Sequence, residues 1–168
     1  WGDGEGIFNY SQEARNILSA CIHNGEKEPG DPIMEPENYL IRFIPSRKFS
    51  DPSYHCAHFY ELFSMWANEE DRPFWKKAAK ASEYLKKACH KDTGLAAEYA
   101  YYDGTPYEKE QDVFGGRHDW YYSDSYRVIA NIGLDYEWFA ADEWNVENNN
   151  KVQKFFCETH KDEEFKIY

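Results

Sequence analysis

Residues 123–141, SDSYRVIANIGLDYEWFAA, carry the pattern that decides the class of fold. Apolar side chains recur there at the spacing of an amphipathic helix. The positions that the pattern turns inward are Val128, Ile129, Ile132 and Trp138. The stretch therefore predicts a helix that begins near Ser123 and runs towards Ala141.

The rest of the chain predicts more helices separated by long loops. Helical periodicity covers about residues 11–24, 53–68 and 71–90, and a shorter helix follows Asn145. Ser11 and Asp71 stand where N-caps are expected, and Gly25 stands where the first helix ends. Prolines and glycines interrupt residues 25–52 and 94–122, which read as loops. Because no segment shows a convincing strand pattern, the expected class is all-α.

Composition narrows the kinds of function. The 168 residues suffice for one domain, and a hydrophobic content of 42% supports a packed core. A formal net charge of -12 repels phosphate backbones and anionic lipid, so neither nucleic acid nor a membrane is an expected partner. Aromatic residues make up 18% of the chain, with 14 Tyr against 11 Phe. This excess of Tyr fits a half-wet, sugar-binding cleft better than a dry core.

The four cysteines are far apart and form no CxxC pair. Buried free thiols are the favoured interpretation, which favours a reducing, cytoplasmic compartment. A disulfide and secretion both stay open, since Trp1 follows no initiator Met. No apolar run approaches the roughly 18 residues of a membrane span.

Two carboxylates stand out by their neighbours. Asp124 begins a predicted helix among tyrosines, with Arg127 one turn away to hold it ionised. An ionised Asp beside aromatic faces suits a general base that activates water next to a sugar, and a carboxylate serving the helix dipole is the alternative. Asp51 stands at another loop-to-helix junction, where a capping role is favoured.

Other chemistries find little support. His55, His58 and Glu61 recur every three residues, but ordinary hydrogen-bonded histidines are favoured over a zinc site and no metal is expected. No cysteine stands in a local context that suggests an activated thiol. The sequence also contains no nucleophile elbow, P-loop or dinucleotide fingerprint.

Several segments, taken in order, resemble glycoside hydrolase family eight. The resemblance runs through nearly the whole chain and is greatest to reducing-end xylose-releasing enzymes of that family. The segments that carry it are Trp1–Gly4, Phe49–Tyr54, His58–Phe63, Thr93–Ala96, Tyr99–Pro106 and Tyr121–Arg127.

The resemblance implies an (α/α)6 toroid of six outer and six inner helices with a cleft at one end. It implies inverting hydrolysis of β-1,4-linked xylo-oligosaccharides, with xylose released from the reducing end. It implies no cofactor, and a monomer is expected. Endo-acting hydrolysis of glucan, xylan or chitosan, or a non-catalytic sugar-binding module, are the alternatives.

The resemblance also assigns roles. Asp124 matches the general base, Tyr54 matches a tyrosine that contacts that base and the attacking water, and Arg127 matches an arginine that supports the base. Four more residues become candidate substrate contacts: Tyr122, Tyr126, His58 and Asp51.

The chain also departs from the family pattern. The family's general acid lies in a Glu-Gly-Met-Ser-Tyr-Gly motif, which does not occur here. A functional Asp in a Pro-Asp-Gly segment and a later His-Pro segment are also missing. Residues 1–168 are therefore expected to be the central portion of one catalytic domain, inactive alone. The loop Tyr107–Trp120 is longer than the family pattern predicts, which affects the expected shape of the cleft.

Overall fold

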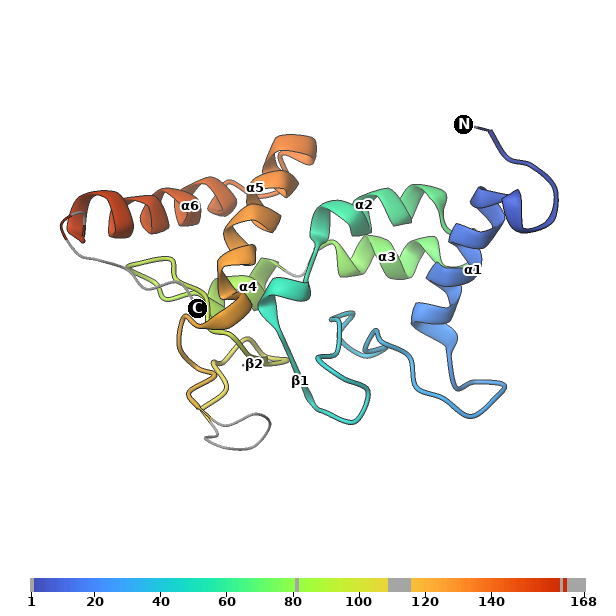
Figure 1. Ribbon diagram of the computed structural model, residues 1–168, viewed down its shortest axis with the longest axis horizontal. Helices are drawn as coiled ribbons and strands as arrows, with labels where there is room; N and C mark the ends of the chain where they lie inside the picture. The colour runs from blue at the N-terminus through green and yellow to red at the C-terminus, as the bar shows by residue number, and fades with distance from the viewer. Residues whose placement is uncertain (1, 81, 109–115, 161, 163–168) are drawn as a thin grey trace.

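The computed structural model describes residues 2–80, 82–108, 116–160 and 162. Helices make up most of the regular structure of these residues (Figure 1). The α-helices are α1 (Tyr10–His23), α2 (Ala57–Trp66), α3 (Arg72–Ala78), α4 (Ser82–Ala88), α5 (Arg127–Phe139) and α6 (Trp144–Lys154). Shorter 3-10 turns are η1 (Gly6–Phe8), η2 (Pro52–Tyr54) and η3 (Ser123–Tyr126), and a π-helical turn, η4 (Phe155–Thr159), follows α6. No helix of the described residues is long and apolar enough to cross a membrane.

The predicted helices exist, but two of them are divided. The helix expected over residues 53–68 is η2 followed by α2, because extended backbone at His55 turns the chain between them. The helix expected over residues 71–90 is α3 followed by α4. The division lets Trp75 of α3 and Leu85 of α4 pack into two different cores.

The N-cap of the first helix lies two residues earlier than predicted. The Asn9 side chain accepts a hydrogen bond from the backbone N–H of Gln12 at 3.0 Å, so Asn9, and not Ser11, is the N-cap of α1. The backbone N–H of Ser11 instead donates to Asp3. At the other end Gly25 has a φ of +95° and follows the helix as predicted.

A small sheet qualifies the all-α prediction. Strands β1 (Phe49–Ser50) and β2 (Ala100–Tyr101) pair antiparallel, with Phe49 opposite Tyr101 and Ser50 opposite Ala100. Two residues are too few to show the period-2 alternation by which a strand is recognised. In Figure 1 this pair lies below the helices, among the long loops.

Three apolar clusters hold the elements together. One joins α4, β2 and α5 around Leu85, Val128 and Ile132, and a second joins α2 and α3 around Trp75. The third lies under the loops and consists of Phe49, Tyr99 and Tyr107. All four cysteines are free thiols, as predicted, but only Cys89 is buried, while Cys21 and Cys56 are half-buried and Cys157 is exposed.

One inward prediction on α5 is wrong. Val128 and Ile132 are buried as expected, but Trp138 is 47% exposed. Its ring packs edge-on against His58 at 5.2 Å, so it covers α2 from outside.

Candidate functional site

Asp124 stands on a strained turn at the start of α5. Ser123, the residue before it, has a φ of +47°, which non-glycine residues rarely adopt and which clusters at functional sites. The Ser125 hydroxyl ties the turn by donating to the Tyr122 carbonyl at 2.7 Å and accepting from the Tyr122 N–H at 3.1 Å. The turn thus holds the Asp124 carboxylate at the surface, where it is about one third exposed.

The structure brings Arg127 to Asp124. An Nη1–Oδ2 distance of 2.8 Å joins the two side chains across the junction of η3 and α5. The Tyr126 side chain and then the charge of Asp124 raise the pKa of Arg127. The guanidinium is therefore a permanent positive charge beside this carboxylate.

Asp51 is the buried cap of the neighbouring turn. Its Oδ1 accepts a hydrogen bond from the Ser53 N–H at 2.7 Å, which confirms the capping interpretation. Burial raises the pKa of Asp51 to about 6, the Ser53 hydrogen bonds oppose this, and the charges of Asp124 and Glu98 add to it. Asp51 therefore lies close enough to Asp124 for the two carboxylates to interact.

The charges of both carboxylates act on Tyr54. It ends η2, which contacts η3, and its ring stacks on Phe43 with 6.0 Å between centroids. Burial raises the pKa of the Tyr54 phenol, and the charges of Asp51 and Asp124 raise it further. The phenol thus stays neutral and keeps a proton to donate.

Glu98 and His118 form a buried pair that sequence reasoning missed. Glu98 Oε2 lies 2.6 Å from His118 Nδ1, and the two side chains are 6% and 2% exposed. The His118 ring stacks on Tyr99 at 4.4 Å, and backbone hydrogen bonds join residues 98 and 99 to 120 and 118. The two residues belong to separate irregular segments, so no local pattern could pair them.

Exposed aromatic residues lie close to Asp124 in the chain. Trp120, Tyr122 and Tyr126 are 58%, 46% and 56% exposed. Arg117 lies over the Trp120 ring at 4.9 Å, and Arg127 lies over the Tyr126 ring at 5.8 Å. Flat, half-wet rings near a carboxylate suit the apolar face of a sugar. Residues 109–115 of the loop expected to be long lie outside the described residues.

His58 is not brought to this cluster. It is 1% exposed on α2, and its ring contacts Phe59 and Trp138. Burial lowers the pKa of His58, against the opposing effect of the Asn131 carbonyl. Its Nδ1 has no hydrogen-bond partner among the described residues, whereas the Asn131 carbonyl accepts a hydrogen bond from the ring, as expected of an ordinary hydrogen-bonded histidine. Within the described ranges, no three His, Cys, Asp or Glu side chains are grouped to hold a metal.

The helical scaffold thus presents one carboxylate, with its arginine, near exposed aromatic rings, whereas glycoside hydrolysis uses a pair of carboxyl groups. The comparisons confirm the resemblance seen in the motifs. The chain is 62% identical over 160 residues to the reducing end xylose-releasing exo-oligoxylanase of Halalkalibacterium halodurans. It is 55% identical over 159 residues to the reducing-end xylose-releasing exo-oligoxylanase Rex8A of Paenibacillus barcinonensis. These matches cover 94% of the chain but only 40% and 41% of the relatives.

Solved structures of such enzymes have the same fold over this segment. Rex8A of Paenibacillus barcinonensis complexed with xylose matches 94% of the chain and 41% of its own, with a TM-score of 0.88 at 55% identity. A variant of a reducing-end xylose-releasing exo-oligoxylanase complexed with xylobiose matches 97% of the chain and 42% of its own, with a TM-score of 0.85 at 59% identity. The chain therefore spans about 40% of the length of these relatives. No family model matches it.

Proposed function

We propose that this chain is the central portion of a catalytic domain that hydrolyses β-1,4-xylosidic bonds. The complete protein releases xylose from the reducing end of xylo-oligosaccharides, with inversion at the anomeric carbon. The observation that carries the proposal is the Asp124–Arg127 pair, 2.8 Å apart, in a chain 62% identical to an exo-oligoxylanase.

Asp124 acts as the general base in this proposal. It draws a proton from a water molecule whose oxygen bonds to the anomeric carbon on one face of the sugar ring, while an acid on the other face protonates the leaving oxygen and the glycosidic bond breaks. Inversion needs about 6.5–9.5 Å between the two carboxyl groups, so that the water fits. The acid comes from a part of the protein outside this chain, because the motif expected to carry it does not occur here.

The neighbours of Asp124 orient it for the reaction. Arg127 fixes one oxygen of its carboxylate. Tyr54, whose raised pKa keeps the phenol neutral, donates a hydrogen bond to the carboxylate or the water. Asp51 caps the turn that carries Tyr54 and adds negative charge behind the base.

The substrate stacks on the exposed rings. Tyr122 and Tyr126 flank Asp124 on either side in the chain and are each about half exposed. They offer flat faces and hydroxyl groups to a neutral oligosaccharide, whose binding a net charge of -12 does not oppose. His58 contacts substrate only if another part of the protein displaces Trp138 from its ring. The helices α1 to α6 are part of an (α/α)6 toroid, which the TM-scores of 0.84–0.88 to exo-oligoxylanase structures support.

A chimera tests the proposal directly. In it, this chain replaces the matching 160 residues of the Halalkalibacterium halodurans enzyme, which supplies all other parts. We expect the chimera to convert xylotriose that is isotopically labelled in its reducing-end sugar into labelled xylose and unlabelled xylobiose. Proton NMR before mutarotation should show the new reducing end as the α-anomer. Label in xylobiose would contradict reducing-end release, and mixed internal fragments from long xylan would indicate an endo-acting enzyme.

The role of Asp124 is tested in the same chimera. General-base assistance contributes about 10²–10⁴-fold, so Asp124→Asn should lower kcat by that factor with the melting temperature unchanged. Asp103→Asn is the matched control, because Asp103 is exposed and only caps a turn at Thr105. If Asp124→Asn turned over as fast as this control, Asp124 would not be the base.

A further inference from the structure

A small cavity lies behind the Tyr54 turn, away from the exposed rings. Its volume is about 10 Å³, and residues of the η2–α2 junction, the end of α3, α4, α5 and α6 line it. Its polar lining consists of His55, Asn131, Asp135 and Asn145, and its apolar walls include Leu85 and Ile132. Such a volume admits about one water molecule.

His55 brings unpaired polar atoms to this cavity. The side chain is 1% exposed, with the rings of Tyr60 and Tyr84 edge-on to it at 5.0 and 6.3 Å. Neither imidazole nitrogen makes a hydrogen bond of ordinary geometry to a described residue, although the Ala78 carbonyl lies near enough to the ring to oppose the effect of burial on the pKa of His55. Burial lowers the pKa of His55 to about 4, so the ring is neutral and has one donor and one acceptor.

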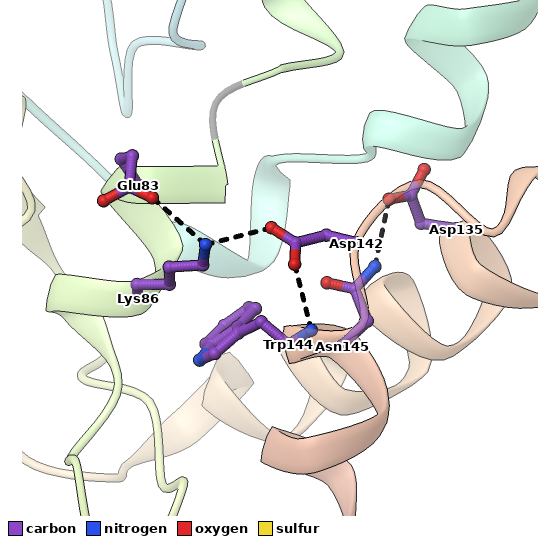
Figure 2. A network of polar contacts seen from close by, with 6 residues as sticks. All are labelled: Glu83, Lys86, Asp135, Asp142, Trp144 and Asn145. Atoms are coloured by element: carbon purple, nitrogen blue, oxygen red, sulfur yellow. Dashed lines mark hydrogen bonds and ion pairs between the residues drawn. The ribbon is translucent and has the colours of Figure 1, made fainter.

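Asp135 brings a second unpaired atom from the opposite side. Figure 2 shows its carboxylate facing Asn145, whose side-chain amide donates to Oδ2 at 3.1 Å. The carboxylate is 6% exposed, and its Oδ1 has no hydrogen-bond partner among the described residues. Asn145 is itself held in place at the start of α6, where the neighbouring Trp144 N–H donates to Asp142 at 2.9 Å.

Two unpaired polar groups that line one cavity lower the stability of the fold unless a hydrogen-bonding molecule joins them. A buried donor or acceptor left without a partner costs about 1–3 kcal/mol, and buried water typically makes two to four hydrogen bonds to such groups. We propose that this cavity is a binding site for one water molecule, which donates to Asp135 Oδ1 and bonds an imidazole nitrogen of His55. The water thereby joins the segment that follows Tyr54 to helix α5.

The substitution His55→Leu distinguishes a water-filled site from a dry one by the sign of its effect on the melting temperature. With water bound, His55→Leu leaves Asp135 Oδ1 unpaired, so the melting temperature of the full-length protein should fall. In a dry cavity His55→Leu removes two unpaired atoms, so the melting temperature should rise or stay unchanged. The double variant His55→Leu/Asp135→Leu should lose less than the sum of the two single variants, because both act on one bridge.

Glu137→Gln is the matched control, since Glu137 is exposed on the same helix and its change should leave the melting temperature unaltered. A high-resolution crystal structure of the same protein should show one solvent peak within hydrogen-bond distance of both side chains. A cavity without density, or a direct hydrogen bond from His55 to Asp135, would overturn the proposal. None of these results depends on the substrate, so the proposal can fail while the proposed function stands.

Discussion

The guanidinium of Arg127 lies 2.8 Å from the carboxylate of Asp124, and both side chains are partly exposed to solvent. Exposed ion pairs contribute about 0–1 kcal/mol to stability. The pair therefore contributes little to the stability of the fold. Its effect is to hold Asp124 in one orientation beside a positive charge.

Replacement of Arg127 should separate stability from activity. In the chimera we expect Arg127→Gln to lower kcat for xylotriose by about tenfold or more, because the base loses its orienting charge, while the melting temperature changes little. Arg127→Lys should retain more activity than Arg127→Gln, since the charge is kept. Lys91→Gln, which removes an exposed cation on another loop, serves as the control. Equal kcat for Arg127→Gln and this control would show that the pair has no role in the reaction.

Asp51 should make stability depend on pH. The pKa of the Asp51 carboxyl is raised in the folded state from 3.8 to about 6, so the folded protein binds more protons than the unfolded chain between these values. Stability from this group is therefore present below about pH 4 and is lost as the pH rises towards 6. Because one pKa unit corresponds to 1.36 kcal/mol, the loss is about 2–3 kcal/mol.

Asp51→Asn should remove that loss, since Asn can still accept from the Ser53 N–H. We expect the variant to gain stability relative to the wild type between pH 4 and pH 7, as measured by denaturant unfolding. Asp103→Asn provides the comparison, because hydrogen bonds to Thr105 lower the pKa of the exposed Asp103 carboxyl, so no gain with rising pH is expected. A constant difference between Asp51→Asn and wild type across this range would refute a raised pKa.

Ser123 should tolerate glycine but not a branched residue. Its φ of +47° costs an ordinary residue about 1–2 kcal/mol and costs glycine nothing. Ser123→Gly should therefore keep both activity and melting temperature near wild type, whereas Ser123→Val should lower both by shifting Asp124. Comparable kinetics for the two variants would mean that this backbone conformation is unimportant.

The outer face of α2 should make the isolated chain associate. Phe59, Met65 and Trp66 are 42%, 52% and 67% exposed on this helix. Exposed apolar area of this kind favours association. We expect the isolated 168 residues to bind a hydrophobic dye and to unfold without a sharp transition. Trp66→Gln should reduce dye binding, and a sharp thermal transition of a monomeric isolated chain would disagree with this expectation.

The helices were predictable from sequence where their apolar periodicity is local. Val128 and Ile132 mark α5 because they recur within one segment. The breaks at His55 and between α3 and α4 were not predictable from sequence. They arise because the two parts of each expected helix pack differently in the folded protein. β1 and β2 are too short to have a period at all.

The candidate site was predictable only in part, for the same reason. Asp124 and Arg127 lie one turn apart, so their contact follows from the sequence alone. Asp51 and Tyr54 came to the site through the resemblance of whole motifs, because local pattern shows Asp51 only as a cap. Glu98 and His118 come together through tertiary packing, which the local sequence of neither segment predicts.

The pairing of β1 with β2 sets the order in which the site can form. Phe49 and Tyr101 are about fifty residues apart, so closing this contact costs more chain entropy than forming any helix. The helices can form as soon as their own residues are available, but Asp51 and Glu98 meet only once this long loop has closed. During synthesis, α1 to α4 leave the ribosome before the turn that carries Asp124, whereas α5 and α6 follow that turn, so Asp124 emerges between two parts of its own scaffold.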